Sequence, residues 1–336
     1  MDSRSPANAE RPAKREGPAK AGRYIRSVPG AGYLLVILLA VFSIFGEGFA
    51  TLPNILNIGV QGSVLLLLAL PMTLIIMTEG LDLSMGAVLS LAGVVLATLL
   101  MNGHGLAVAL AAAAGVGLAF GVTNGVLVVM LGLPPFVVTL GTLGIAQGFA
   151  LVLTGGQSVV GIGDALPALY ESRPIGVPFS IVSAAVAFLV FWFMMGRTRL
   201  GSYVSALGGN REALVLAGVH VNLVHVAIYA AGGLMSGLAA LLLTGRMSAG
   251  HPTAAIGLEF DAIAAVIVGG TSFERGNGTL AGTLVGVLTI GVLKNGLNVM
   301  SVSSSLQVAS IGVLVIAALV IDSALTAFRR PARSMT

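Results

Sequence analysis

The chain contains no cysteine and very little charge, since only 9% of its 336 residues are Asp, Glu, Lys or Arg. Without cysteine it can form no disulfide, thiolate metal site or thiol nucleophile. A soluble domain carries about 25% charged residues, whereas 56% of this chain is hydrophobic and its mean hydropathy is +1.00. A soluble fold of this composition would precipitate, so the sequence predicts a polytopic membrane protein.

Lysine is scarce as well, and Lys14, Lys20 and Lys294 do not lie in the G-x-x-x-x-G-K-[ST] loop that binds nucleotide phosphates. No Ser–His–Asp set is arranged on soluble loops, and the histidines lack the spacing of metal ligands. The histidines are His104, His220, His225 and His251. The sequence therefore predicts a chain that is not an enzyme and binds no cofactor. Any energy source must be an ion gradient or another subunit.

Apolar runs dominate the chain after residue 30. A helix that crosses a bilayer needs about 20 apolar residues, which predicts an all-α polytopic transmembrane helical bundle of about ten spans. The predicted spans are 31–50, 58–77, 83–101, 106–130, 135–154, 178–196, 223–244, the short 258–272, 279–298 and 306–326. The predicted domains are a disordered cytoplasmic tail (1–30), a transmembrane domain (31–326) with a cytoplasmic loop (197–222), and a cytoplasmic tail (327–336).

Basic residues cluster in the N-terminal tail, in the loop after the sixth predicted span, and in the C-terminal tail. They are Arg4, Arg11, Lys14, Arg15, Lys20, Arg23 and Arg26, then Arg197, Arg199 and Arg211, then Arg329, Arg330 and Arg333. Because cytoplasmic loops are enriched in Lys and Arg, we expect both termini in the cytoplasm and an even number of spans. Topology then explains the net charge of +4, so membrane lipid is the expected surrounding and no nucleic-acid partner is needed.

Two segments place acids at the mouths of apolar runs. Their candidate substrate-path residues are Asp82 and Ser84 in the first segment, and Glu259 and Asp261 in the second. A carboxylate at a bilayer centre costs roughly 2.5–3.5 kcal/mol on insertion scales, and such residues usually face a cavity or a partner. Two other interpretations stay open. Asp82 is placed to cap the helix that follows it, and Glu259 and Asp261 are placed to end a helix in water.

The two acidic segments also indicate an internal repeat. Gly80–Ser84 is similar to Gly257–Asp261, and an Asn-Gly pair follows each, at Asn124-Gly125 and Asn295-Gly296. The predicted topology places the first acids at the inner end of a span and the second at the outer end. That is the pattern of an inverted repeat of two five-helix halves, although Gly- and Leu-rich segments also resemble one another by chance.

Neutral polar residues lie inside several predicted spans, and Asn124 and Asn295 are further candidates for the substrate path. The whole set is Gln61, Asn124, Thr139, Thr142, Gln147, Thr271, Thr283, Thr289 and Asn295. Buried amides and hydroxyls must be paired or hydrated. As a group they favour a polar permeant, whereas for any one residue an ordinary interhelical hydrogen bond is the simpler interpretation.

The loop 197–222 contains a short amphipathic helix. Asn210 is a predicted helix cap and Gly218 a predicted stop. Such a helix has little core of its own, which indicates that it docks into a partner rather than serving only as a surface loop. The predicted docking residues are Leu207, Gly208, Gly209, Asn210, Arg211, Glu212, Ala213 and Gly218.

The motifs together resemble the permease subunit of bacterial ribose/xylose/autoinducer-2-type ABC importers. They are G-L-D-L-S-M-G (80–86), N-G-V-L-V (124–128), L-P-P-F-V-V-T-L-G-T (133–142), L-T-G-G (153–156), A-L-G-G-N-R-E-A (206–213), A-G-V-H-V (217–221), L-E-F-D-A-I-A-A-V-I-V-G-G-T-S-F (258–273), G-N-G-T-L-A-G-T-L-V-G (276–286) and K-N-G-L-N-V (294–299). The resemblance covers nearly the whole chain after residue 30. One departure is the segment Glu274–Arg275, where the family has a Gly in place of Arg275.

The resemblance implies an inner-membrane permease that moves a monosaccharide or related polar solute into the cytoplasm by alternating access. It implies a dimer with a second permease copy or paralogue, an ABC ATP-binding subunit that carries ATP and Mg²⁺, and a periplasmic sugar-binding protein. The segment 206–213 would be the coupling helix seated in the ATP-binding subunit. The alternatives are an ion-coupled secondary transporter of a small polar solute and a passive channel.

Overall fold

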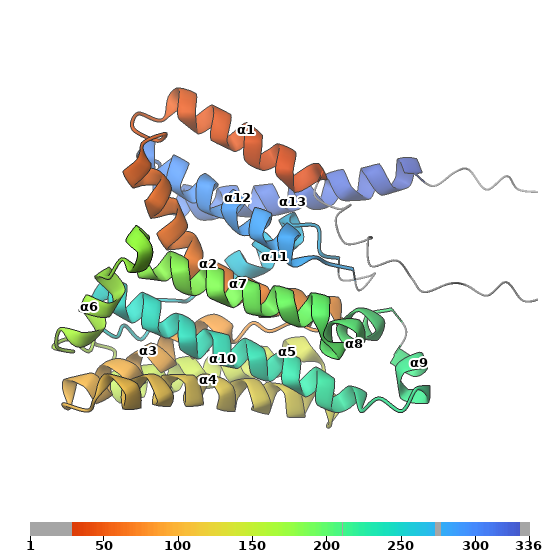
Figure 1. Ribbon diagram of the computed structural model, residues 1–336, viewed down its shortest axis with the longest axis horizontal. Helices are drawn as coiled ribbons and strands as arrows, with labels where there is room; N and C mark the ends of the chain where they lie inside the picture. Colours follow the sequence, from red (N-terminus) through yellow and green to blue (C-terminus); the bar gives the residue numbers. More distant parts are fainter. Residues whose placement is uncertain (1–28, 210, 273–276, 330–336) are drawn as a thin grey trace, which may run out of the picture.

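The structure is a computed structural model that describes residues 29–209, 211–272 and 277–329. Within these residues the chain forms helices and no β-strand, and one isolated bridge pairs Val159 with Gly250. A helix occupies each of the ten predicted spans (Figure 1): α1 (Pro29–Phe45), α2 (Leu52–Met77), α3 (Met85–Met101), α4 (Leu106–Val129), α5 (Pro135–Thr154), α7 (Phe179–Arg197), α10 (Val221–Met247), α11 (Leu258–Val268), α12 (Leu280–Val299) and α13 (Ser304–Arg329). Short helices lie between them: α6 (Ala165–Glu171), η1 (Pro174–Gly176), α8 (Arg199–Leu207) and α9 (Arg211–Leu216).

Six helices of the described chain are long and apolar enough to cross a membrane, namely α2, α4, α5, α7, α10 and α12. Helices α1 and α3 have shorter apolar stretches, as does α13 over the part searched. Helix α11 has 11 residues, which at about 1.5 Å per residue is roughly half of a 30 Å hydrocarbon core. The chain is therefore a polytopic helical membrane protein, while ten complete crossings and the inverted repeat stay predictions.

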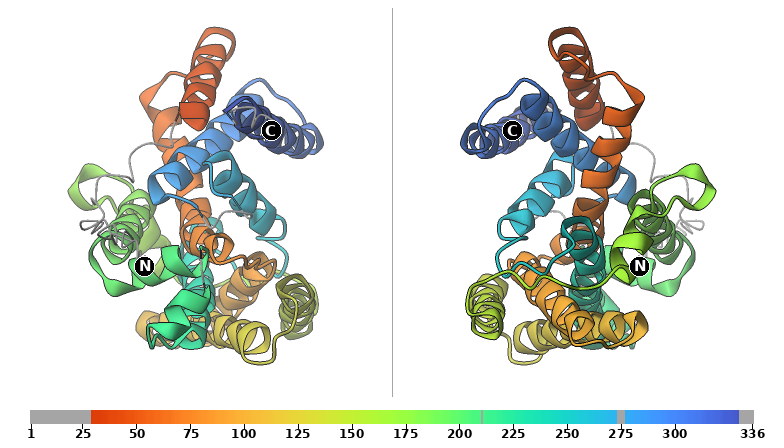
Figure 2. Two further views of the ribbon diagram at one scale, coloured as in Figure 1. Left: turned by 90° about the vertical axis from the view of Figure 1, so that its right-hand side faces the viewer. Right: turned by 90° about the vertical axis from the view of Figure 1, so that its left-hand side faces the viewer.

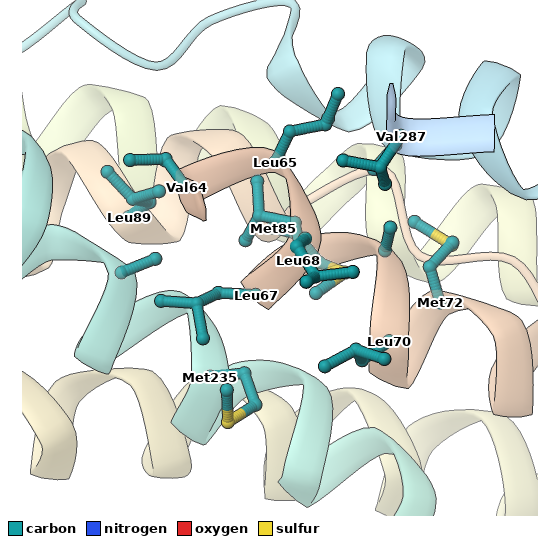
Figure 3. Close-up of a cluster of buried hydrophobic side chains, with 14 of the residues drawn as sticks. Val64, Leu65, Leu67, Leu68, Leu70, Met72, Met85, Leu89, Met235 and Val287 are labelled. Carbon is teal, nitrogen blue, oxygen red and sulfur yellow. The ribbon is translucent and has the colours of Figure 1, made fainter. Parts of the chain in front are cut away.

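Helix α2 lies at the centre of the bundle. In its most apolar 18-residue window, 89% of the residues are buried, whereas the corresponding share is 17% for α7 and 22% for α4. A helix that is apolar all round is one that is buried all round. Figure 3 shows the result: Leu67, Leu68 and their neighbours on α2 point toward Met85 of α3, Met235 of α10 and Val287 of α12.

Figure 2 views the bundle along its length and shows how the other helices surround α2. Helices α1, α12 and α13 lie on one side, and α3, α4, α5 and α10 on the other. In Figure 1 the start of α1, the end of α13 and the pair α8–α9 lie at one end of the bundle, and α6 lies at the opposite end. The predicted tails 1–30 and 327–336 fall largely outside the described residues, although α13 extends three positions into the second of them.

Glycines allow α4 and α10 to pack with their backbones in contact. An added Cβ on Gly121 of α4 would lie 2.5 Å from the carbonyl oxygen of Tyr229 and 3.0 Å from Ala230 Cα, both on α10. Added Cβ atoms on Gly117 and Gly233 would overlap the facing backbone in the same way. Small residues at such interfaces are the main way helices associate in lipid. Helices α4 and α10 therefore form one close-packed unit.

We predict that Gly121→Ala destabilises the protein while Gly115→Ala, on the same helix, does not. The methyl group at 121 meets the α10 backbone, whereas an added Cβ at Gly115 has no atom within 4 Å. Overpacking typically costs about 1–3 kcal/mol. The thermal unfolding midpoint in mild detergent measures the effect, and equal midpoints for the two variants would contradict the packing described here.

Candidate functional site

A non-helical connector, residues 78–84, joins α2 to α3 inside the bundle. Helix α2 ends where the Thr78 hydroxyl donates to the carbonyl oxygens of Leu74 and Ile75, each at 3.0 Å. Glu79 then takes a left-handed conformation with φ of 60°, which is uncommon for a residue other than glycine. At membrane depth, irregular backbone is tolerated only where protein buries it or where it lines a cavity.

Asp82 and Ser84 of this connector meet Asn124 of α4. All three are among the residues that the sequence predicts for the substrate path. The Asp82 carboxylate accepts from the Ser84 backbone N–H at 2.9 Å and from the Ser84 hydroxyl at 2.6 Å. Asn124 Nδ2 of α4 donates to Ser84 Oγ at 2.8 Å. Their exposed fractions are 1%, 1% and 0%. In this conformation the three side chains pin the connector to α4 and are closed to solvent.

Asp82 is not the helix cap that the sequence suggested. Helix α3 begins at Met85, and its N-cap residue is Ser84. The Asp82 carboxylate instead binds the N–H of the cap residue itself, one position ahead of the helix. The prediction was wrong because the connector continues in a non-helical conformation through Leu83 before α3 begins.

Glu259 lies at the start of α11 and is 2% exposed. Both of its carboxylate oxygens accept from the backbone N–H of Gly257 at 3.1 Å. Gly257 has φ of +92°, a conformation that favours glycine. The carboxylate also lies against Gly86 of α3, where it leaves no space for a Cβ. The two acidic segments therefore meet, and the expectation that they lie at opposite ends of their spans is wrong.

Three successive residues of α12 reach three different helices. The Lys294 ammonium forms an ion pair with Asp261 of α11. Asn295 exchanges hydrogen bonds with Asn54 of α2 at 2.8 and 3.0 Å. Gly296 packs against the Phe42 ring of α1 and leaves no space for a side chain. For Asn295 the structure therefore shows the interhelical hydrogen bond that was the simpler interpretation.

Five other neutral polar residues of the predicted set divide into two groups, while the buried Thr271 hydroxyl belongs to neither because it has no hydrogen-bond partner among the described residues. Thr283 bonds Thr73 of α2 at 2.6 Å, and Gln147 donates to the carbonyl oxygen of Pro252 at 3.0 Å. Thr139, Thr142 and Thr289 donate only to carbonyl oxygens of their own helices. The first group links separate segments, whereas the second satisfies itself locally.

The sequence missed Lys294, Asn54 and Tyr229 as members of these clusters. Lys294 carried a usable signal, because a lysine within an apolar span needs a counter-charge and Asp261 is one of the two acids of the preceding helix. Asn54 lies 241 residues from its partner. Tyr229 of α10 is fully buried, and its hydroxyl lies against the connector, 2.6 Å from where a Cβ on Gly80 would stand.

The short helices α8 and α9 pack together at the end of the bundle that the basic residues predict to be cytoplasmic. Leu207, Leu214 and Val221 form a buried cluster of their own, so the expectation of little core needs correction. Gly218 ends α9 with φ of +76°, as predicted. Gly208 is the C-cap of α8 and Gly209 follows it, while Asn210 lies outside the described residues, as do Glu274 and Arg275.

The C-terminal end of α9 exposes two apolar side chains. Val215 is 57% exposed and Leu216 is 89% exposed, directly beyond the buried Leu214. Arg211, Glu212 and Ala213 form the first half of this helix. An exposed apolar tip bordered by charged residues is typical of a protein–protein contact.

Comparisons with known proteins place these features in context. A family model described as "branched-chain amino acid transport system / permease component" matches residues 54–319. The chain is 40% identical to the ribose import permease protein of Escherichia coli strain K12, over 86% of this chain and 91% of the relative. It is 37% identical to the D-allose transport system permease protein of the same strain, over 87% and 90%. It is 30% identical to the L-arabinose ABC transporter permease protein of Azospirillum brasilense, over 87% and 86%. No solved structure matches the chain.

We predict that Lys294→Met destabilises the protein and that the double variant Asp261→Asn/Lys294→Met recovers most of the loss. Removing one partner of a buried pair leaves an uncompensated charge and costs up to about 3–5 kcal/mol. The cost is smaller here because the Lys294 side chain is 32% exposed. Unfolding midpoints in detergent measure both variants, and a double variant no more stable than Lys294→Met would argue against a coupled pair.

Proposed function

The chain belongs to the family of transport-system permease components whose model matches residues 54–319, and we propose that its solute is a monosaccharide imported at the expense of ATP hydrolysed by a partner. The observation that carries this proposal is similarity along nearly the whole chain to permeases named for ribose, allose and arabinose. The family description names branched-chain amino acids, but the named relatives are named for the sugars ribose, allose and arabinose. A neutral polar solute also suits the described interior, where the unpaired buried side-chain atoms are those of two amides, three hydroxyls and one imidazole, and none belongs to a carboxylate, lysine or arginine.

The energy source in this proposal is an ABC ATP-binding subunit that docks on α9. The sequence has no phosphate-binding loop with its lysine, so nucleotide chemistry belongs to another chain. The exposed Val215 and Leu216, carried on the buried Leu214, fit a groove on such a subunit. A periplasmic sugar-binding protein would deliver the solute at the opposite end, where α6 and the bridge between Val159 and Gly250 lie.

We further propose that the chain crosses the bacterial inner membrane ten times with both termini in the cytoplasm, as two inverted halves, and pairs with a second permease. The solute path would run along the interface of that pair and open by alternating access. Glu259 and Asp261 are the proposed path acids, with Lys294 holding Asp261 between transport cycles. Asp82, Ser84, Asn124 and Asn295 act as gate residues that hold helices in register.

The test is uptake of radiolabelled D-ribose into proteoliposomes that contain the chain, its ATP-binding subunit and its sugar-binding protein. We expect uptake that needs internal ATP, stops with vanadate and ignores an excess of L-leucine. Uptake that persists without the ATP-binding subunit but stops with an uncoupler would indicate the ion-coupled alternative. Ribose movement without accumulation would indicate a channel.

We predict that Leu216→Asp weakens binding of the ATP-binding subunit about tenfold or more, because it places an unpaired charge in the centre of an apolar contact. Ile175→Asp is the matched control, since Ile175 is 91% exposed and lies in η1 rather than in α9. Co-purification and vanadate-sensitive ATPase activity measure the effect. Equal binding by the two variants would move the docking site away from α9.

A further inference from the structure

Helix α9 is fixed to α10 more firmly than to α7. Arg211 Nη2 of α9 donates to Asn222 Oδ1 of α10 at 2.9 Å. The buried cluster under α9 also includes Val221, the first residue of α10. On the other side, Thr198 interrupts the helix between α7 and α8 with an extended backbone (φ −115°, ψ 163°), and α8 folds back onto α7, where Gly201 leaves no space for a Cβ against the Met195 backbone. A displacement of α9 therefore acts directly on the start of α10.

Helix α7 is also separated from α10 within the bundle. An apolar groove of about 530 Å³ lies between their facing side chains, with Val190 on α7, Leu238 on α10 and Leu67 of α2 among its walls. By contrast, α10 runs unbroken for 27 residues and packs on the α4 backbone through glycines. Tightly packed elements move as units because close-packed interiors transmit strain. Helix α10, with α4, is thus the stiff element that leads from α9 into the membrane.

One face of α10 connects the two regions. Asn222, His225 and Tyr229 are spaced by three and four residues, which places them in one row along the helix. The rings of His225 and Tyr229 have centroids 5.8 Å apart. Asn222 is exposed at the end that holds Arg211, whereas Tyr229 is fully buried. The row therefore runs from the α9 contact to the bundle interior.

Tyr229 lies against Gly80 of the connector 78–84. A Cβ on Gly80 would lie 2.6 Å from the Tyr229 hydroxyl oxygen and 3.0 Å from Ile75 Cγ2. The connector then continues through Ser84, held by Asn124 of α4, into α3, where Gly86 lies against Glu259. A shift of α10 relative to α2 must consequently move the connector and, through it, the path acid.

We propose that α10 is the lever of this permease and that Tyr229 is the positioning residue through which α9 moves the connector 78–84. The proposal rests on the proposed function, because it needs an ATP-binding subunit to drive α9. It adds a role for Asn222, His225 and Tyr229. The contact itself, rather than chemistry of the phenol, carries the displacement.

The natural absence of cysteine allows the test to be made with a single introduced thiol. Glu79 is exposed in the connector, so Glu79→Cys carries a nitroxide spin label that reports connector motion in the complex with the ATP-binding subunit. We expect vanadate-trapped ATP to change the spectrum of the parent. In Y229F we expect that spectral change to be smaller by about fivefold or more, since about fivefold is the lower end of the range for allosteric coupling between sites. The amount of ribose moved per ATP hydrolysed falls with it. ATPase activity is retained.

A compensating variant and a matched control separate transmission from simple destabilisation. Gly80→Ala alone crowds the Tyr229 oxygen and impairs the response. Y229F combined with Gly80→Ala removes that oxygen and supplies a methyl group in its place, so it restores part of the response, limited by Ile75. Leu223 lies on the same helix and is 59% exposed, so Leu223→Ala keeps the full response.

The lever is overturned if Y229F keeps the full nucleotide response, if the double variant is no better than Gly80→Ala, or if Leu223→Ala loses as much as Y229F. A parent complex that takes up ribose normally yet shows no spectral response also overturns it. Loss of both uptake and response in the parent would instead defeat the proposed function.

Discussion

The fold depends on satisfying backbone polar groups at the places where helices break inside an apolar bundle. Lipid offers no hydrogen bonds, so each broken turn must find its partners within the protein. At the connector, Thr78 closes the end of α2 and Asp82 binds both the N–H and the hydroxyl of Ser84. These bonds let the chain leave α2 and begin α3 among buried leucines without an unsatisfied backbone group at the turn.

The second break follows the same logic and lies against the first. Helix α11 begins at Leu258, where Glu259 accepts the free N–H of Gly257. Helix starts carry a partial positive charge, which a nearby carboxylate stabilises. Asp82 before α3 and Glu259 at the start of α11 both fulfil this condition, and Gly86 brings the two starts into contact. The starts of α3 and α11 thus meet with their nearby backbone N–H groups bonded to carboxylates. Such a junction can shift without leaving backbone groups unpaired, whereas bending a continuous helix would break its internal hydrogen bonds.

Much of the fold follows from hydropathy, and the errors have a common origin. Apolar runs located all the long helices, and the short run at 258–272 correctly indicated a short α11. The stop at Gly218 was predictable because its φ of +76° favours glycine. The opposite-end placement of the acids failed because the topology argument treated every apolar run as a full crossing, whereas α11 begins beside α3 in the interior.

The polar pairs were harder to predict than the helices, since they depend on which helices become neighbours. Asn295 was a recognisable candidate, but nothing near it in the sequence identifies Asn54 as its partner. Tyr229 looked like any aromatic residue of a lipid-compatible helix, and only the glycine at position 80 makes room for its hydroxyl. Lys294 was an exception, because a lone lysine in an apolar span requires a nearby acid and the adjoining helix offers two, Glu259 and Asp261, of which Asp261 is the partner.

The distribution of glycine and of empty space divides the bundle into a stiff part and a compliant part. Helices α4 and α10 touch through backbone at Gly121 and Gly233, so neither can shift without the other. Helices α7 and α10 leave an apolar groove between them. Because its walls are apolar side chains, the groove can widen or narrow without breaking a hydrogen bond. In the proposed mechanism, a displacement at α9 must reach the connector through a stiff element while other helices accommodate the motion. The continuous course of α10 from Val221 to Met247 fits the first role, and the groove between α10 and α7 fits the second.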